Sequence, residues 1–179
     1  MEVKSVSVLH KEPFLYLNNS SYVNNAGKLK SWTWAERPHN THAVFIAALH
    51  GDKLVLIREF RVPVNGYVWS LPAGLIEDNQ TPLETALREL TEETGLSLKK
   101  FIRDRSRITR TSPGMTNEGC FFVFIEAEGT PNTNLCEESE DIQVILATRE
   151  QVAKILDMGE NIDSKAYLIM MRFAEDGKI

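Results

Sequence analysis

The sequence has few cysteines and no cluster of metal-binding side chains. Its 179 residues include two cysteines, Cys120 and Cys136, and four histidines, and none of them stands in a CxxC, HExxH or mixed Cys/His spacing. Zinc sites and disulfide frameworks depend on such spacings, so the sequence argues against both. We expect the two cysteines to be ordinary core or surface residues of a protein in a reducing compartment.

Long hydrophobic runs and a basic surplus are also lacking. No apolar run approaches the roughly 20 residues that a membrane-spanning helix needs, and the N-terminal stretch lacks the charged-then-apolar pattern of a signal peptide. The 25 acidic and 20 basic residues give a net charge of −5, whereas nucleic-acid binding usually shows a basic stripe. We therefore expect a cytoplasmic protein that binds neither membranes nor nucleic acids. An anionic substrate would need a metal ion or well-placed arginines to offset the repulsion.

What the sequence does contain suffices for one domain with a small attached lobe. Hydrophobic residues make up 42% of the chain, as is typical of globular proteins. The N-terminal part combines short apolar runs with turn candidates at Asn18–Ser21 and Asn24–Gly27, which predicts an antiparallel β meander. Residues 1–38 are predicted to form this lobe and residues 39–179 the main domain, with Pro38–Thr41 as the connector.

Beyond the lobe, apolar patterning predicts strands interleaved with helices. Apolar runs on either side of Gly51-Asp52, at residues 43–49 and 53–58, predict a β-hairpin. Further strands are expected at Tyr67–Leu71, Phe121–Glu126 and Ile142–Ala147, and helices at Thr81–Thr94, Gln151–Met158 and about Asp163–Phe173. This order indicates an α/β fold with a mixed sheet covered by helices. The long acidic loop Glu128–Ser139 is typical of functional or mobile segments.

The most informative segment is the predicted helix over residues 81–94. Thr81 predicts the N-cap, Pro82 suits the first turn, Glu84 completes a capping box, and Gly95 ends the helix. The apolar side chains at helical spacing, which predict the buried stripe, are Leu83, Ala86, Leu87 and Leu90.

The opposite face of this helix carries Arg88, Glu89, Glu92 and Glu93. Glu89 and Glu93 are four residues apart, so their carboxylates project side by side, which is mildly destabilising without a counter-charge. Mg²⁺ prefers a few carboxylates together with water and phosphate oxygens. Arg88 and Glu92 share the same spacing and predict an ion pair. A solvated charged face is the common alternative, but the two glycines that bracket the segment favour a metal site.

The segment from Gly74 to Leu96 resembles the Nudix box, G-x5-E-x7-R-E-U-x-E-E-x-G-U, in which U is a bulky aliphatic residue. The matching positions are Gly74, Arg88, Glu89, Leu90, Glu92, Glu93, Gly95 and Leu96. Gln80 stands where the family has its first Glu, which braces the loop and helix. Because the amide is almost isosteric and can still hydrogen-bond, we expect this departure to be tolerated.

Other stretches resemble the ADP-ribose pyrophosphatase branch of that family, in the same order along the chain. They are Ser31-Trp32 with Arg37 ("TW…R"), Arg58–Arg61, Gly66-Tyr67 and Leu71–Gly74 ("QFR…GY…PAG"), Ser112–Glu118 ("SPG-x-T-x-E"), and Glu137–Ile142 with Arg149–Gln151 (a late acidic loop and the next helix). The resemblance implies a Nudix fold, an α/β mixed β-sheet sandwiched by helices, with residues 39–179 as the catalytic domain. It also implies that the lobe of residues 1–38 serves dimerisation and contacts the substrate base.

The resemblance further implies Mg²⁺-dependent hydrolysis of a P–O–P linkage, with Mn²⁺ able to substitute. Glu89, Glu93 and the backbone carbonyl of Ala73 are the implied metal ligands, with Glu92 as a further catalytic acid beside them. Glu140 matches the general base of the late acidic loop. Another acid of residues 137–141 is the alternative for that role.

The substrate contacts are less sharply defined. Glu118 matches a second site carboxylate, and the guanidinium groups of Arg37 and Arg61 suit phosphate or ribose oxygens, with surface ion pairing as the alternative. Trp32 either stacks on the base or packs in a core or dimer interface. In the similar enzymes the N-terminal lobe of one subunit completes the other subunit's site, so a homodimer is implied.

The expected reaction converts ADP-ribose, or a related nucleoside diphosphate sugar, to a nucleoside monophosphate and a sugar phosphate. Two alternatives stay open. One is another Nudix substrate, such as GDP-mannose or a nucleoside triphosphate. The other is a catalytically weak module that senses a nucleotide, for which Gln80 is the only support and against which the intact acids of the box argue.

Overall fold

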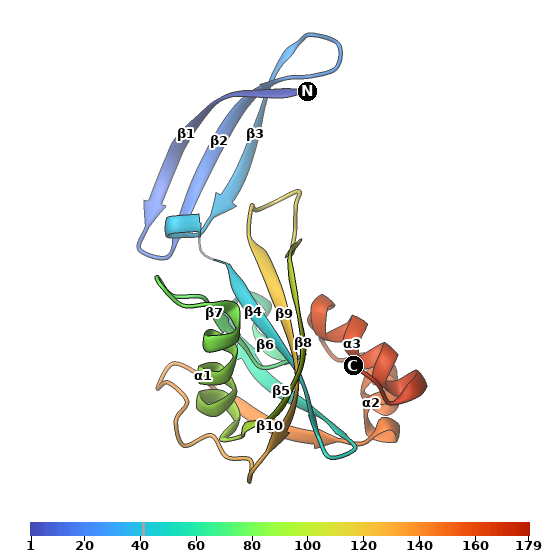
Figure 1. Ribbon diagram of the computed structural model, residues 1–179. Coiled ribbons are helices and arrows are strands. Elements are labelled where there is room, and N and C mark those ends of the chain that lie inside the picture. The colour runs from blue at the N-terminus through green and yellow to red at the C-terminus, as the bar shows by residue number, and fades with distance from the viewer. Residues whose placement is uncertain (41) are drawn as a thin grey trace. The chain divides into compact units, whose positions relative to one another are not determined.

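The computed structural model describes residues 1–40 and 42–179 and divides into two compact units (Figure 1). The N-terminal unit consists of Met1–Ala43 and Ile108–Cys120. The larger unit consists of Val44–Arg107 and Phe121–Ile179. Thr41, the last residue of the predicted connector, lies outside the described residues. Pro38–Asn40 forms a short 3-10 helix, η1.

The N-terminal unit contains an antiparallel sheet in the order β1 (Glu2–Glu12), β2 (Leu15–Val23), β3 (Leu29–Glu36). The predicted turn at Asn24–Gly27 is confirmed, because Asn24 Oδ1 accepts hydrogen bonds from the amides of Ala26 and Lys28 at 3.0 and 2.9 Å. The predicted turn at Asn18–Ser21 is wrong, since these residues lie within β2 and the chain turns at Pro13-Phe14.

The polar side chains within β2 explain that error. Asn18 is 1% exposed and donates a 2.8 Å hydrogen bond to Glu36, and Ser20 accepts one of 2.8 Å from the indole of Trp34. Their polar groups are therefore satisfied by the neighbouring strand instead of capping a turn.

The segment Ile108–Cys120 is bound to β3. The amide of Ala35 donates to the carbonyl of Met115 at 2.8 Å, and the side-chain amide of Asn117 donates to Glu36 at 2.9 Å. The N-terminal unit is therefore built from two separate stretches of the chain.

The larger unit is organised around a seven-stranded mixed sheet. Its strands are β4 (Ala43–His50), β5 (Lys53–Arg61), β6 (Gly66–Ser70), β7 (Ala73–Leu75), β8 (Ser97–Arg110), β9 (Gly119–Glu128) and β10 (Ile142–Ala147). The order is β10-β5-β4-β9-β8, with β6 paired to β5 and β7 paired to β4. The short 3-10 helix η2 (Val62–Val64) connects β5 to β6.

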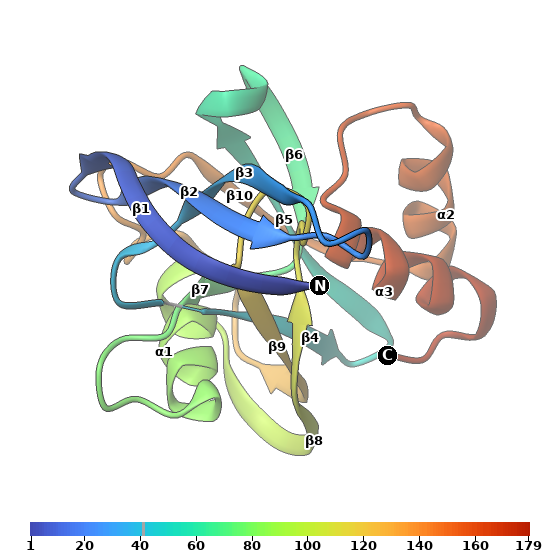
Figure 2. The same ribbon diagram turned by 90° about the horizontal axis from the view of Figure 1, so that it is seen from above.

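Helices cover both sides of this sheet, with α1 (Pro82–Thr94) on one side and α2 (Arg149–Asp157) and α3 (Ser164–Asp176) on the other (Figures 1 and 2). The predicted α/β sandwich is confirmed. β8 was not predicted, because its charged residues leave no apolar run to read. Within the described residues, no helix is long and apolar enough to cross a membrane.

The core between α1 and the sheet positions the site. Its buried side chains are Val44, Ile46, Ala48, Val55, Ala86, Leu90, Leu96, Val123, Ile125 and Ala127. Ala86 and Leu90 belong to the predicted stripe of α1, and Leu83 packs against this cluster. Thr81 and Thr148 form the predicted capping boxes with Glu84 and Gln151. The helix that carries the acids is therefore fixed by its cap and by one apolar face.

Candidate active site

Gly74 and Glu89 are in close contact. A Cβ atom added at Gly74 would lie 1.8 Å from Oε1 of Glu89, so any side chain there would displace this carboxylate. The Glu89 side chain is only 12% exposed as a result. The first glycine of the box-like segment therefore lets β7 pass directly over the first acid of α1.

Glu93 is buried, in contrast to the expectation that it shares an exposed face with its neighbours. The residue is 3% exposed, and its Oε2 accepts a 2.9 Å hydrogen bond from the backbone amide of Ala73. Burial raises the pKa of Glu93 well above its ordinary value, the hydrogen bond from Ala73 opposes this, and the charges of Glu89, Glu59 and Glu140 add to it. The amide of Ala73, at the start of β7, is thus bound to Glu93, and the role of the Ala73 carbonyl as a metal ligand stays a prediction.

Arg88 is the cation nearest to these acids in α1. Its guanidinium lies 2.7 Å from Glu92 and 2.9 Å from Glu89, which confirms the predicted Arg88–Glu92 pair. Burial raises the pKa of Glu89 to about 7, even though Arg88 opposes the shift. One guanidinium therefore does not neutralise the local negative charge.

Glu59 is a further buried acid that the sequence reasoning missed. It is 7% exposed, and burial raises its pKa despite Arg61, whose Nη2 lies 2.6 Å from Glu59 Oε2. That oxygen is buried and receives no hydrogen bond of acceptable geometry. The sequence carries one sign of this acid, because Glu59 stands where the QFR run of the similar enzymes has Gln. Arg61 was predicted for phosphate or ribose, and in the structure it pairs with this acid.

Glu140 closes the acidic loop near the same carboxylates. Its Oε2 accepts a 3.0 Å hydrogen bond from the amide of Glu137, and its own amide donates to the carbonyl of Glu137 at 2.9 Å. After burial, which is the larger cause, the charge of Glu140 contributes to the raised pKa of Glu59, Glu89 and Glu93. The structure therefore brings Glu140 within electrostatic reach of the acids of α1.

The acidic loop is also tied to the end of α1. The amide of Asn132 donates to the carbonyl of Thr94 at 2.9 Å, and the Cys136 thiol lies 3.6 Å from the carbonyl of Glu92. Gly95 has a φ of 68°, and a Cβ there would lie 2.1 Å from Asn132. Gly95 is thus needed both to end the helix and to let the loop approach.

The donor set fits a hard divalent cation in chemical type. Buried carboxylates with raised pKa values repel one another unless a cation neutralises them, and Mg²⁺ needs only one or two carboxylates beside water and substrate oxygens. The groups available are Glu89, Glu93 and the Ala73 carbonyl, with Glu92 at the rim of the helix. Across residues 1–40 and 42–179, no three His, Cys, Asp or Glu side chains are already arranged as a metal site.

The bracing position of the box is occupied by Gln80. Its Oε1 accepts a 2.8 Å hydrogen bond from Thr85, which is fully buried in α1, and its amide lies 3.4 Å from Glu77. Gln80 therefore ties the loop before α1 to the helix itself, as we expected of an amide in place of the acid.

The remaining predicted site residues lie in the N-terminal unit. Arg37 Nε lies 2.6 Å from Glu118 Oε1, so the two residues predicted for substrate contact form an ion pair with each other. Thr111 also donates to Glu118, at 3.1 Å. They belong to a different unit from Glu89, Glu93 and Glu140.

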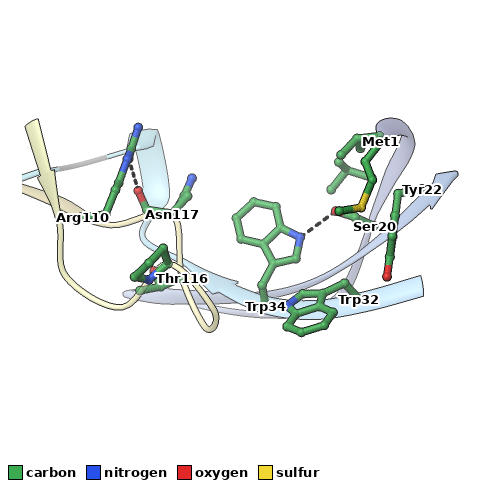
Figure 3. A pocket seen from close by; sticks show the side chains of 11 residues that line it. Met1, Ser20, Tyr22, Trp32, Trp34, Arg110, Thr116 and Asn117 are labelled. Atoms are coloured by element: carbon green, nitrogen blue, oxygen red, sulfur yellow. Dashed lines mark hydrogen bonds between the residues drawn. The ribbon is translucent and has the colours of Figure 1, made fainter. Parts of the chain in front are cut away.

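Trp32 lines a pocket of about 610 Å³ within the N-terminal unit (Figure 3). It is 53% exposed, and its indole N–H donates to the carbonyl of Gly114 at 3.1 Å, so it is not a core residue of this chain. Trp34, two residues along β3, lines the same pocket, as does Arg110. Trp34 was missed, although residues two apart on a strand share a face.

The chain is similar to a protein family and to several known proteins. The family model described as NUDIX domain matches residues 39–167. The chain is 33% identical over 136 residues to an ADP-ribose pyrophosphatase of Bacillus subtilis (strain 168), which covers 73% of this chain and 71% of that protein. It is 26% identical over 184 residues to an ADP-sugar pyrophosphatase of Mus musculus, which covers 92% of this chain and 84% of that protein.

A solved structure described as an ADP compounds hydrolase is similar in fold. The TM-score is 0.74 at 20% identity, and the match covers 97% of this chain and 94% of the other. The match extends over both the N-terminal sheet and the larger unit.

Proposed function

This chain belongs to the Nudix family, and we propose that it is a Mg²⁺-dependent pyrophosphatase that hydrolyses ADP-ribose or a related nucleoside diphosphate sugar. The observation that carries the proposal is the packing of Glu89 and Glu93 against Gly74 and Ala73, where buried acids lack a sufficient counter-charge. The relatives named ADP-ribose pyrophosphatase and ADP-sugar pyrophosphatase support the choice of substrate class.

Glu89, Glu93 and the carbonyl of Ala73 would hold the cation, with Glu92 beside them. When bound, the cation neutralises the diphosphate and lowers the pKa of a water molecule. Glu140 would accept the proton of a water whose oxygen attacks one phosphorus, and the bridging oxygen then leaves with the other phosphate as the bond to the attacked phosphorus breaks. The products from ADP-ribose are AMP and ribose 5-phosphate. The guanidinium of Arg61 would donate hydrogen bonds to the charged phosphate oxygens.

In this proposal the pocket of the N-terminal unit binds the nucleobase. Trp32 and Trp34 supply flat apolar surface, and Arg110, Thr116 and Asn117 supply polar groups at its wall (Figure 3). Stacking of a base on an aromatic side chain contributes about 1–3 kcal/mol in nucleic-acid sites. The Arg37–Glu118 pair places a donor and an acceptor in the same unit for ribose hydroxyls or phosphate.

The functional unit in this proposal is a homodimer joined through the N-terminal sheet. Every residue of β1 is exposed, and this includes the apolar Val3, Val6 and Leu9, which are 61%, 55% and 56% exposed. Exposed apolar surface of this kind marks interaction sites. Light scattering should give twice the 20.3 kDa chain mass. A monomeric mass at micromolar concentration would contradict the dimer.

A side-by-side assay tests the substrate class. Wild-type protein is given ADP-ribose, ADP-glucose, GDP-mannose and dATP at equal concentration with Mg²⁺, and kcat/KM is measured for each. We expect ADP-ribose to lead and ADP-glucose to be cut as well. A preference for dATP or GDP-mannose would assign another Nudix substrate, and the absence of turnover on all four would favour a nucleotide-sensing module.

A further inference from the structure

The register of β5 with β6 and β10, the strands beside Glu140, places two sets of side chains on opposite faces of the sheet. In the larger unit, Phe60 on β5 pairs with Tyr67 on β6, and Glu59 pairs with Ile142 on β10. The amide of Phe60 also donates to the carbonyl of Asp141 at 3.1 Å, so the ladder continues one residue before β10. Because side chains alternate along strands, Phe60, Tyr67 and Asp141 lie on one face and Glu59 lies on the other.

The direction of Asp141 fixes the direction of Glu140. Glu140 follows the turn at residues 138–139 and precedes Asp141, the residue that continues the β10 ladder. Because adjacent residues of a strand point to opposite faces, Asp141 on the Tyr67 face directs Glu140 toward the Glu59 face. The charge of Glu140 acts on that face, since it adds to burial, the larger cause, in raising the pKa of Glu59 and Glu93. A one-residue slip of this ladder would turn Glu140 away from the acids of α1.

A side-chain hydrogen bond from β6 holds Asp141 on its face. The hydroxyl of Tyr67 donates to Oδ2 of Asp141, across 74 residues of sequence. The ring of Tyr67 is itself fixed, because the Arg58 guanidinium lies 4.6 Å from its centroid and the Phe60 ring meets it edge-on at 5.6 Å. Arg58 is in turn paired with Glu160 at 3.3 Å.

The contacts that tie the acidic loop to α1 lie before Glu140, at Asn132 and Cys136. Between β9 and β10 the chain contains no helix or strand. The contacts of Glu140 are with Glu137, three residues earlier in the same loop. The nearest anchor of Glu140 to the sheet is therefore Asp141.

We propose that Tyr67 and Asp141 are positioning residues, a latch on the face of β6, β5 and β10 opposite Glu59, which holds Glu140 on the face of the reacting diphosphate. The inference rests on the proposed role of Glu140 as general base. The latch residues do not touch the substrate, and their effect passes through the direction of Glu140 alone.

The test compares Tyr67→Phe in two backgrounds. In the wild-type background, loss of the hydroxyl should lower kcat for ADP-ribose roughly tenfold and leave KM within about twofold, because a misdirected base slows chemistry and not binding. In the Glu140→Gln background the same change should have less than about a twofold effect, since the group it positions is already disabled. Tyr167→Phe, the same chemical change on the exposed surface of α3, is the matched control and should not alter kcat.

Two variants of Asp141 separate the hydrogen bond from simple packing. Asp141→Asn keeps a side-chain oxygen that accepts from Tyr67 and should retain most of the rate, whereas Asp141→Ala should match Tyr67→Phe. Equal losses on Tyr67→Phe with and without Glu140→Gln would overturn the proposal, because Tyr67 would then act through another group.

Hydrogen exchange gives a readout that does not depend on turnover. Peptides covering residues 137–145 should exchange faster in Tyr67→Phe than in wild type, and those of Tyr167→Phe should not change. If Glu140→Gln retains full activity, the proposed base fails, yet the exchange result still decides whether the latch holds the loop. Unchanged exchange in Tyr67→Phe overturns the latch whatever the activity shows.

Discussion

The two units of this chain differ in the exposure of their chemically important side chains. In the larger unit, carboxylates are buried: Glu93 is 3% and Glu59 is 7% exposed. In the N-terminal unit, aromatic and apolar side chains are exposed: Trp32 is 53% exposed, and every residue of β1 is exposed. Both arrangements are unfavourable for an isolated chain, since buried charge and exposed apolar surface each cost free energy.

The difference indicates what each unit binds. Buried acids are stabilised by a cation, so the larger unit is suited to metal and phosphate chemistry. Exposed aromatic groups are stabilised when a flat apolar ligand or another protein surface covers them, so the N-terminal unit is suited to recognition. Substitutions of the buried acids in the larger unit should therefore lower kcat, and substitutions of the aromatic residues in the N-terminal pocket should raise KM.

The largest expected effect follows from Glu93→Gln. The amide fits the same volume but cannot supply the charge that holds a cation, so kcat should fall roughly 10³-fold, or about 4 kcal/mol of barrier. Thermal melting in a chelator should show equal or higher stability, because the buried charge is gone. The control is Glu175→Gln, an exposed acid of α3. Near wild-type turnover in Glu93→Gln would remove Glu93 from the metal site.

Trp32→Ala tests whether the pocket of the N-terminal unit binds the substrate. Loss of a stacking surface of about 1–2 kcal/mol should raise KM for ADP-ribose about tenfold while kcat stays within about twofold. Phe14→Ala serves as the control, since Phe14 is 80% exposed in the turn between β1 and β2 and does not line the pocket. A loss confined to kcat would show that the pocket does not bind the ground-state substrate.

A smaller effect is expected for Gln80→Glu. Gln80 already accepts the hydrogen bond from Thr85 that ties its loop to α1, so the acid should change kcat by less than about tenfold, or about 1.4 kcal/mol. Steady-state kinetics measure this directly. A gain of several hundredfold would identify this protein as a disabled hydrolase and favour nucleotide sensing.

The smallest effect concerns stability and pH in the metal-free protein. Burial raises the pKa of Glu89 from 4.5 to about 7. The stability that the protonated Glu89 contributes to the folded state is therefore fully present below pH 4.5 and is lost as pH rises through about 7. Melting in a chelator should give a Tm about 3 °C lower at pH 8 than at pH 5, and Glu89→Gln should reduce this difference. A Tm that rises over the same range in wild type and not in Glu89→Gln would contradict the assignment.

Local features of the sequence predicted most of the structure near α1. Thr81, Glu84 and Gly95 set the helix ends through contacts within a few residues, and the structure has all of them. The hairpin of β4 and β5 follows from Gly51-Asp52 between two apolar runs. These elements depend on propensities and spacings that a single sequence carries.

Features that depend on distant contacts were not predicted. Helical spacing placed Glu93 with the exposed acids, but the chain at Ala73 covers it and reverses its exposure. The polar residues of β2 look like a turn because their partners, Glu36 and Trp34, lie on another strand. The contact of Tyr67 with Asp141 joins strands whose pairing cannot be read from either segment alone.

We propose that this chain hydrolyses ADP-ribose with a divalent cation held by the buried acids of α1. The most direct measurement is the formation of AMP and ribose 5-phosphate from ADP-ribose, followed by chromatography, in Mg²⁺, in excess chelator, and in chelator with Mg²⁺ or Mn²⁺ added back. We expect equimolar products with Mg²⁺, none in chelator, and recovery when either cation is restored. Product formation that persists in chelator, or no products under any of these conditions, would contradict it.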